Sequence, residues 1–598
     1  GNIYAVKSYK SGKTYYLFYD FLDRLVRVRD ELGSTYEYAY DANNCMESMV
    51  HTCGTHTMKT VYTYDKDSRE TKTRCAKTFE RTTEYDKFSR VSRRTWKTAS
   101  PYISAYTYID KGENRYRLPK TVKNGSETLN YTYDANGNII SIKDSAGEST
   151  FRYDELNQLI RENNHQLNKT ITYAYDLGGN LTVEKEYAFT TTETLPDTPV
   201  KTMTGTYDSA WKDKLLSWDG TAMTYDAIGN MLTRGGTTYT WTQGRRLSGV
   251  ENGKSIKYLY DHTGARVNKT VDNTVTEYQW AGDLLLSEKT DGRIIWYCYD
   301  SQANLISVTI RGITYFYVRN VQGDIIALVD ADGKVVVKYT YDSWGKVVAV
   351  TGELADTVGV QNPFRYKGYY YDNETGMYYL KSRYYDAEIK RFICMDKYFM
   401  TNRGMNKSNM LVYCENNPIN RVDMFGTCWY DAKGNWRHDN WEYKGNYKRQ
   451  PKPAGKPNIN ITYKLNKTMR NNAEELRNYR KENGYASAVG YFISKVKTGG
   501  DWDFKNQKSW NLNRDFSYTY KNETLRVDDI GNIHYGYVGR ELFGVGMLVA
   551  GGGAYQIKTD YPNIQWNHFW SLFDDPQDQW MVIFGSTLWD ADMDNSYY

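Results

Sequence analysis

The chain has 598 residues, which is too long for one hydrophobic core, so we expect two or more domains. The net charge is only +5, and 25% of the residues are charged. The overall charge of the chain therefore does not predict nucleic-acid binding. No run of about 18 apolar residues occurs, so no membrane-spanning helix is predicted. The 58 tyrosines and only 11 prolines favour a mainly β protein, because tyrosine suits a half-buried pleated surface.

The first residues, GNIYAVKSYKSG, lack the charged and apolar regions of a signal peptide. They already lie inside a repeat, so we expect a fragment of a longer protein. The seven cysteines include no close CxxC pair, which favours buried or free thiols over a disulfide framework. The segment CMESMVHTCGTH brings Cys45, Cys53, His51 and His56 close together, so a metal site stays open there as the less favoured interpretation.

A Tyr-Asp pair recurs through the first two-thirds of the chain, at spacings of mostly about 20 to 25 residues. Full copies read YTYDANGNIISIKD (131–144) and YAYDLGGNLTVEKE (173–186). Each copy predicts a strand ending in Tyr-Asp, a turn whose Asn and Gly accept positive φ, and a second alternating strand. We expect the aspartate to accept backbone N–H bonds across the turn and the tyrosine to pack against the next copy. One hairpin cannot bury its face alone, so stacked copies should form a continuous sheet. The copies start at Tyr19, Tyr40, Tyr64, Tyr85, Tyr133, Tyr153, Tyr175, Tyr207, Tyr225, Tyr260, Tyr299 and Tyr341.

This pattern resembles the YD repeats of the RHS (rearrangement hotspot) family over about residues 1–427. The motifs are most specific in NPFRYKGYYYDNETGMYYLKSRYYDAEIKRFICMD (362–396) and LVYCENNPINRVDMFG (411–426). The resemblance implies that YD hairpins at 1–361 spiral into a closed β-shell and that an RHS-associated core at 362–427 plugs one end. Such closure would protect the strand edges, and the rest of the chain would be enclosed.

The RHS core carries a self-cleaving aspartyl site, which the resemblance places at Arg383, Asp396 and Asp423. Two carboxylates held close together cannot both ionise, so one acts as an acid and the other as a base. The arginine would tune this pair or hold the scissile carbonyl.

This chain departs from the family pattern at two points. The Asp-Pro of the family is Asp396-Lys397 here, and the terminal DPxGL motif reads DMFGT (423–427). We expect the cut near the Thr427–Cys428 bond. The alternative is that these residues only cap the shell through hydrogen bonds.

The composition changes after Gly426. We expect a proline-containing linker at 428–463 and a C-terminal toxin domain of α+β type at 464–598. The stretch 465–497 predicts a helix broken near Gly484.

Charge is divided unevenly along this tail. Residues 428–527 hold 20 basic and 10 acidic side chains, whereas 528–598 hold 2 basic and 10 acidic ones. The basic half could face a phosphate backbone or form a solvated surface. The apolar run LFGVGMLVAGGGA (542–554) is too short to span a membrane and predicts a buried helix followed by a glycine turn.

The tail resembles the polymorphic toxin type 44 family through KTGGDWDFK (497–505) and DDIGNIHYGYVG (528–539). This resemblance implies a toxin, and a nuclease role is the usual expectation for it.

Histidine is the simplest general acid or base near pH 7, so His534, expected in a turn between two glycines, is the first catalytic candidate. Lys497 and Lys505 could neutralise a phosphate, and Asp503 and Asp529 could orient the histidine or hold a divalent ion. The alternatives are a structural turn histidine and carboxylates that act as caps or surface charges. A ribonuclease needs no cofactor here, whereas a DNase would more often need a divalent metal.

Together these patterns predict an RHS-type delivery shell that encapsulates a C-terminal antibacterial toxin, a ribonuclease. The expected partners are an RNA substrate, a cognate immunity protein and secretion or cell-surface delivery machinery. The shell would be secreted or at the cell surface, and the toxin would act in the target cell cytoplasm. Two alternatives stay open: a metal-dependent DNase or peptidase toxin, and a non-enzymatic surface adhesin built on the same repeats.

Overall fold

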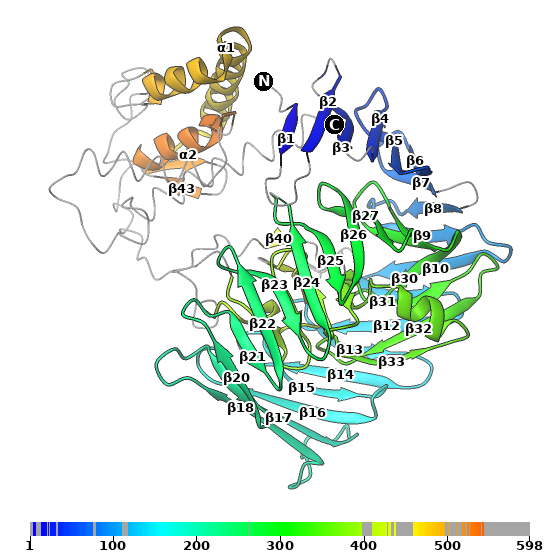
Figure 1. Ribbon diagram of the computed structural model, residues 1–598. Coiled ribbons are helices and arrows are strands. Elements are labelled where there is room, and N and C mark those ends of the chain that lie inside the picture. The colour runs from blue at the N-terminus through cyan, green and yellow to red at the C-terminus, as the bar shows by residue number, and fades with distance from the viewer. Residues whose placement is uncertain are drawn as a thin grey trace. The chain divides into compact units, whose positions relative to one another are not determined.

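The computed structural model describes residues 4–542 apart from a number of gaps, of which the longest are 397–408 and 438–457. The chain divides into two compact units, Asn2–Asn440 and Trp441–Tyr598. Strands dominate the first unit, which confirms the mainly β fold (Figure 1). None of the helices in the described part of the chain is long and apolar enough to cross a membrane.

A ribbon of 33 antiparallel strands makes up most of the first unit in the described residues, and each strand pairs with the next along the chain. The strands are β1 (Ala5–Lys7), β2 (Thr14–Tyr19), β3 (Leu25–Asp30), β4 (Thr35–Tyr40), β5 (Met46–Cys53), β6 (His56–Tyr64), β7 (Glu70–Cys75), β8 (Phe79–Tyr85), β9 (Val91–Trp96), β10 (Tyr102–Tyr108), β11 (Pro119–Asn124), β12 (Glu127–Tyr133), β13 (Ile139–Lys143), β14 (Glu148–Tyr153), β15 (Leu159–Asn164), β16 (Lys169–Tyr175), β17 (Leu181–Ala188), β18 (Lys201–Tyr207), β19 (Leu215–Trp218), β20 (Thr221–Tyr225), β21 (Met231–Arg234), β22 (Thr237–Thr242), β23 (Arg246–Glu251), β24 (Ser255–Tyr260), β25 (Arg266–Val271), β26 (Thr274–Ala281), β27 (Leu284–Thr290), β28 (Arg293–Tyr299), β29 (Leu305–Ile310), β30 (Ile313–Arg319), β31 (Ile325–Val329), β32 (Val335–Tyr341) and β33 (Val347–Thr351).

The Tyr-Asp turns have the predicted hydrogen bonds, as the copy at 131–144 illustrates. The Asp134 N–H donates to the Asn138 carbonyl at 2.9 Å, and the Asn138 N–H donates to Asp134 Oδ1 at 2.8 Å. Gly137 takes a φ of 88°, in the left-handed region that favours glycine. A bulge between Thr132 and Tyr133 shifts the strand register as the turn begins. The aspartate therefore closes the turn, as its position predicts.

In most pairs the tyrosine hydroxyl donates to a backbone carbonyl of the preceding copy, and packing of the ring against the next copy stays a prediction. Tyr153 Oη donates to the Ile139 carbonyl at 2.7 Å, and Tyr175 Oη donates to the Leu159 carbonyl at 2.7 Å. Trp241 uses its indole N–H in the same way, donating to the Met231 carbonyl. A bulge lies directly before Tyr153 and directly before Tyr175. A repeat can therefore carry Trp in place of the Tyr of the Tyr-Asp pair, and the Tyr-Asp pattern alone does not identify such a repeat.

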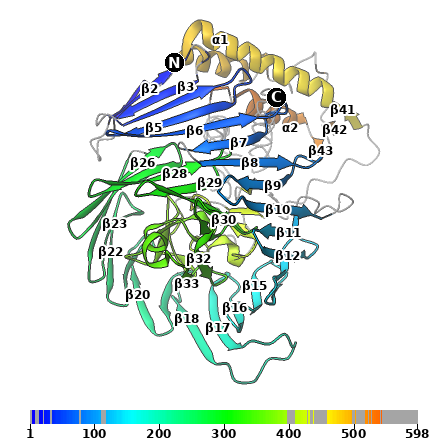
Figure 2. The ribbon, with the colours of Figure 1, turned by 90° about the vertical axis from the view of Figure 1, so that its right-hand side faces the viewer.

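The ribbon winds back on itself, so that β5–β9 lie beside β26–β29 (Figure 2). Side chains join the windings, and the partners in five such contacts are 181 to 243 residues apart in sequence. The separations are 243 residues for Tyr36 and Gln279, 237 for Tyr62 and Tyr299, 219 for Arg81 and Asp300, 195 for Asn124 and Arg319, and 181 for Glu162 and Ser343. Among the described strands, β1 and β33 each pair with one neighbour, so the ladder does not itself close the shell, and closure stays a prediction.

A disulfide joins Cys75 of β7 to Cys298 of β28, across 223 residues of sequence. The expectation of free or buried thiols is therefore wrong for this pair, because sequence spacing alone cannot reveal that two windings bring them together. Beside the bond, Arg81 forms buried ion pairs with Glu70 and Asp300, each at 3.0 Å. We call this contact between β7–β8 and β28–β29 the seam.

The segment CMESMVHTCGTH forms a packing element of the same windings. The His51 ring stacks on Tyr36, with centroids 4.7 Å apart, and meets Trp296 edge-on at 5.0 Å. Burial lowers the pKa of His51 to about 3, so the ring is neutral. No group of three or more His, Cys, Asp and Glu side chains arranged to hold a metal occurs among the described residues.

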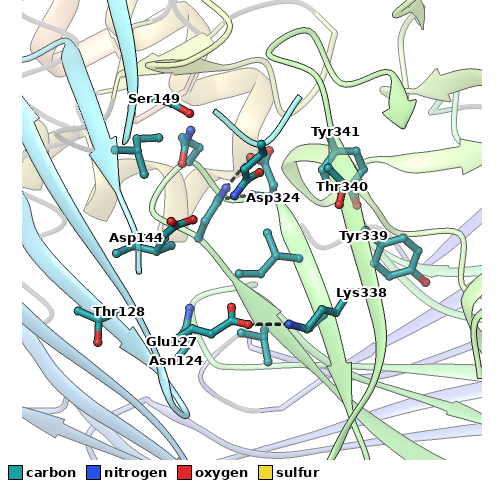
Figure 3. Close-up of a pocket in the computed structure, with 18 of the residues that line it drawn as sticks. Asn124, Glu127, Thr128, Asp144, Ser149, Asp324, Lys338, Tyr339, Thr340 and Tyr341 are labelled. Atoms are coloured by element: carbon teal, nitrogen blue, oxygen red, sulfur yellow. Dashed lines mark hydrogen bonds and ion pairs between the residues drawn. The ribbon is translucent and has the colours of Figure 1, made fainter. Parts of the chain in front are cut away.

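A polar cavity of about 920 Å³ lies farther along the windings, where β10–β14 face β31–β32 (Figure 3). An ion pair between Lys338 of β32 and Glu127 of β12, at 2.6 Å, crosses it. Both side chains are more than half exposed, so water screens this pair and it adds little stability. The windings therefore separate here, in contrast to the seam, where the ion-paired side chains are buried.

The plug, residues 355–426, packs against the ribbon and shares its hydrophobic core. Tyr378 Oη donates to the Gly345 carbonyl at 2.6 Å, and Tyr385 Oη donates to the Trp344 carbonyl at 2.7 Å. Its elements are the one-turn helices η1 (Ala355–Gly359), η2 (Tyr366–Gly368) and η3 (Cys414–Asn416), the four-stranded sheet β34 (Tyr370–Asp372), β35 (Met377–Tyr379), β36 (Tyr384–Asp386) and β37 (Arg391–Phe392), and β38 (Arg421–Val422), which pairs onward with β39 (Trp429–Asp431) and β40 (Trp436–Arg437).

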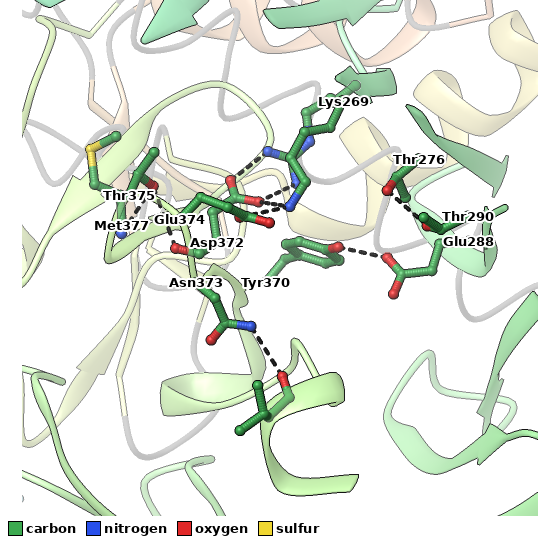
Figure 4. A network of polar contacts seen from close by, with 12 residues as sticks. Lys269, Thr276, Glu288, Thr290, Tyr370, Asp372, Asn373, Glu374, Thr375 and Met377 are labelled. Carbon is green, nitrogen blue, oxygen red and sulfur yellow. Dashed lines mark hydrogen bonds and ion pairs between the residues drawn. The ribbon is translucent and has the colours of Figure 1, made fainter. Parts of the chain in front are cut away.

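A buried ionic network fixes the plug sheet to strand β25 (Figure 4). Arg266 makes a bidentate pair with Asp372, at 2.5 and 3.1 Å, and Lys269 contacts Asp372 and Glu374, each at 3.0 Å. Burial raises the pKa of Asp372, but the two cations outweigh burial and hold the pKa below its ordinary value. Asp372 is therefore ionised, and it neutralises charge that the interior would not otherwise tolerate.

A second anchor places Lys390, in the turn after β36, among three carboxyl groups of the ribbon. Its Nζ lies 2.6 Å from Glu184 Oε2. Burial raises the pKa of Asp342 to about 7, and burial also raises the pKa of Glu162, which accepts a hydrogen bond from Ser343. One lysine cannot fully compensate three buried carboxyl groups, and the raised pKa values of Asp342 and Glu162 reflect this shortage of positive charge.

The second unit is of the predicted α+β type. Helix α1 (Thr462–Val496) is interrupted at Gly484, where φ is 78°, which confirms the predicted break. Strand β41 (Asn458–Asn460) runs parallel to β42 (Ser517–Tyr520), which pairs antiparallel with β43 (Glu523–Leu525). Helix α2 (Val527–Gly539) packs on α1 around a core of its own that includes Leu465, Phe492 and Ile533. The run 542–554 lies outside the described residues except for Leu542, which is buried.

Candidate functional site

Three residues predicted to form the cleavage site meet in the plug. Arg383 directly precedes β36, Asp396 follows β37 and Asp423 follows β38. Arg383 Nη2 lies 3.2 Å from Asp396 Oδ2 and 3.3 Å from Asp423 Oδ2. All three side chains are largely buried. The plug thus brings two carboxylates from separate segments onto one guanidinium nitrogen.

The other faces of the Arg383 guanidinium are also held. Its Nη1 donates to the Met410 carbonyl at 2.9 Å, and its Nε donates to the Gly426 carbonyl. The group lies over the Phe392 ring, with its central carbon 3.5 Å from the ring centroid. Such a fixed fork can orient both carboxylates and a peptide carbonyl at once.

Backbone contacts fix both aspartates. The Asp423 N–H donates to Tyr369 Oη at 2.8 Å, and Asp423 Oδ1 accepts the Phe425 N–H at 3.3 Å. The Asp396 N–H donates to the Met410 carbonyl at 3.1 Å. Two carboxyl groups held in this way can divide the acid and base roles of peptide hydrolysis.

A thiol near the two aspartates is buried. Cys394 lies two residues before Asp396, and its burial raises the pKa of the thiol to about 12. Burial likewise raises the pKa of Cys414 well above its ordinary value. Because the thiolate is the nucleophilic form, neither residue offers cysteine-based cleavage beside the aspartates.

The predicted scissile bond, Thr427–Cys428, lies outside the described residues, and so does Lys397. The described chain reaches Gly426, whose carbonyl accepts the Arg383 Nε–H. Ser382, which is not one of the three residues predicted for the cleavage site, contacts the carbonyl oxygen of Phe425. Its only sequence signal is its position next to Arg383.

In the second unit, His534 lies within α2, so its expected place in a turn is wrong. The ring is fully buried, meets Trp502 edge-on at 5.8 Å, and accepts a bond at Nε2 from the Asn472 side chain at 2.9 Å. Burial lowers the pKa of His534 to about 3, so the imidazole is neutral near pH 7. Apolar contacts of Ile530 and Ile533 keep this glycine-containing segment helical.

The other predicted toxin residues cannot be placed around His534. Lys497, Asp503 and Lys505 lie outside the described residues, and Asp529 belongs to α2 by its backbone alone. Their catalytic roles stay predictions.

Comparisons with known proteins agree with this division of the chain. The family model described as teneurin YD-shell matches residues 54–196 and 193–419, and the one described as bacterial toxin 44 matches residues 491–591. The chain is 33% identical over 282 residues to the tRNA3(Ser)-specific nuclease WapA of Bacillus spizizenii and 30% identical over 396 residues to the tRNA nuclease WapA of Bacillus subtilis. These alignments cover 46% and 56% of this chain but only 12% and 16% of the two relatives. Among solved structures, a crystal structure of TcdB2-TccC3-Cdc42 aligns with a TM-score of 0.49 and 19% identity, over 69% of this chain and 21% of that one.

Proposed function

The chain belongs to the teneurin YD-shell family, and from this premise we propose that it is an RHS-type delivery shell for an antibacterial toxin. The order of the two family matches along one chain carries the proposal. The shell match ends at residue 419 and the toxin match begins at residue 491, after the plug. A shell that keeps a toxin from its substrate until delivery has a clear physical purpose.

The toxin of this proposal is a ribonuclease that acts in the cytoplasm of a competing cell. Two relatives of the chain carry the name of tRNA nucleases, which supports RNA as the substrate class. The producing cell would then need an immunity protein, and the shell would need secretion or cell-surface delivery machinery.

The plug is proposed to cut the chain after the shell, using Asp396 and Asp423. One carboxylate removes a proton from water, whose oxygen attacks the scissile carbonyl, and the other carboxyl group donates its proton to the leaving amine. The products are a new carboxyl terminus on the shell and a new amino terminus on the toxin. The shared contact with Arg383 supports this assignment.

The toxin proposal can be tested on residues 441–598, because this compact unit has its own hydrophobic core. Its expression in bacteria without an immunity protein should arrest growth. The purified unit should degrade RNA and spare DNA, with or without EDTA. Lys467→Ala, which alters an exposed residue of α1, is the control variant and should remain active.

His534→Ala should abolish toxicity if the histidine is catalytic, with folding checked by circular dichroism. If the His534→Ala variant folds and stays toxic, while the separate variant Lys505→Ala or Asp503→Ala is inactive, the catalytic site would be assigned to Lys505 or Asp503 instead. EDTA-sensitive cutting of DNA would support the metal-dependent DNase alternative, and cleavage of protein alone would support a peptidase. Healthy growth at good expression would favour a non-enzymatic surface protein.

A further inference from the structure

Ser382 contacts the last described residues of the plug. Its Oγ lies 2.6 Å from the Phe425 carbonyl oxygen and 2.8 Å from the Gly426 carbonyl oxygen. Its backbone N–H also donates to the Phe425 carbonyl, at 3.3 Å. The segment that leads to the predicted cut is therefore tied directly to the residue that precedes Arg383.

The approach of these two segments is too close for a side chain at residue 426. Gly426 has a φ of 71°, and a Cβ built there would lie 2.6 Å from Ser382 Oγ and 2.9 Å from the Leu380 carbonyl oxygen. Only glycine fits without a shift of the backbone. The Ser382–Arg383 segment and the Phe425–Gly426 segment thus form one tight clamp.

We propose that Ser382 is a positioning residue for self-cleavage, an inference that rests on the self-cleavage proposed above. A hydroxyl has one proton and can donate to one carbonyl at a time. Arg383 Nε already donates to the Gly426 carbonyl, which leaves the Ser382 hydroxyl for the Phe425 carbonyl. The two donors together fix two consecutive peptide units, and Arg383 links the second of them to Asp396 and Asp423.

The chemistry of the carboxyl pair does not involve Ser382, since it contacts carbonyl groups and not the aspartates. Loss of the Ser382 hydroxyl should therefore lower the fraction of molecules in which the Phe425–Gly426 segment is correctly positioned. It should not change the protonation of Asp396 and Asp423. A positioning bond of this kind changes a rate by about tenfold.

The test follows cleavage of the full-length chain over time on denaturing gels, with the product ends identified by mass spectrometry. Ser382→Ala should slow cleavage about tenfold and leave the midpoints of the rate-against-pH profile unchanged. Ser382→Thr, which keeps the hydroxyl, should recover most of the rate. Ser343→Ala is the matched control, because it removes a buried hydroxyl that donates to Glu162 away from this clamp.

Equal rates for Ser382→Ala and wild type would overturn the inference, and so would a shifted pH profile, which would indicate a role in proton transfer. A Ser343→Ala variant that slows equally would also overturn it, because the effect would then be general destabilisation. An intact wild-type chain would instead refute the self-cleavage proposal itself, and the role of Ser382 would fall with it. Cleavage of the wild-type chain on the gel therefore distinguishes failure of the Ser382 inference from failure of the self-cleavage proposal.

Discussion

Replacing Cys75 and Cys298 with alanine should destabilise the shell substantially. The disulfide closes a loop whose ends are 223 residues apart, so in the unfolded chain it removes conformational freedom worth about 5 kcal/mol at 25 °C. For a unit of this size, the loss should lower the urea midpoint by about 1 M. Tryptophan fluorescence can follow the transition, because Trp296 packs against His51 beside the seam.

The same measurement on the wild-type chain with reductant provides a second arm. Reduced wild type should match the double variant, and reductant should leave the double variant unchanged. Cys394→Ala is the control, since Cys394 is a buried free cysteine in the plug and its loss should not introduce sensitivity to reductant. Equal midpoints for oxidised and reduced wild type, with the linked Cys75 and Cys298 peptides confirmed by mass spectrometry, would refute the reasoning.

Three further outcomes are expected. Asp423→Asn should leave one band where the wild-type chain gives two on a denaturing gel, because the carboxyl pair would be lost; two bands would exclude Asp423 from the cleavage. Because the pKa of Asp342 is raised from its ordinary value of 3.8 to about 7, its contribution to stability is fully present below about pH 4 and is lost as pH rises to about 7. Asp342→Asn should therefore raise the melting temperature by about 2 °C at pH 8, by less at pH 5, and leave it unchanged at pH 3. A larger gain at pH 5 than at pH 8 would contradict this sign. Asp372→Asn should cost about 3–5 kcal/mol in urea unfolding, since Arg266 and Lys269 would keep buried charge without a full partner; a loss below about 1 kcal/mol would show that the network is not strongly coupled.

The hairpin array could be predicted because its signals are local. Asp134 and Gly137 lie within one turn, and period-two alternation directly reports which residues share a strand face. The cleavage residues could be placed together only through a resemblance, since Arg383, Asp396 and Asp423 belong to three segments that short-range patterns do not connect.

Contacts between windings had no sequence signal. Cys75 and Cys298 meet because the ribbon returns after many hairpins, and nothing near either cysteine encodes that distance. The predicted turn at His534 is wrong for a different reason. Its flanking glycines favour a turn, but burial of Ile530 and Ile533 against α1 outweighs that preference and makes the segment helical.

The contacts between facing windings limit how such a protein can change in length. In most repeats the tyrosine hydroxyl bond reaches the preceding copy, so a hairpin added to the array would be accommodated locally. Yet a hairpin inserted between Arg81 and Gln279 would lengthen the sequence between Tyr36 and Gln279 and between Arg81 and Asp300, and would misalign both contacts. Related proteins that remain folded would therefore gain or lose several hairpins together, so that the contacts between facing windings are restored, or would add hairpins outside the windings that contact each other. A single hairpin inserted within those windings would be selected against.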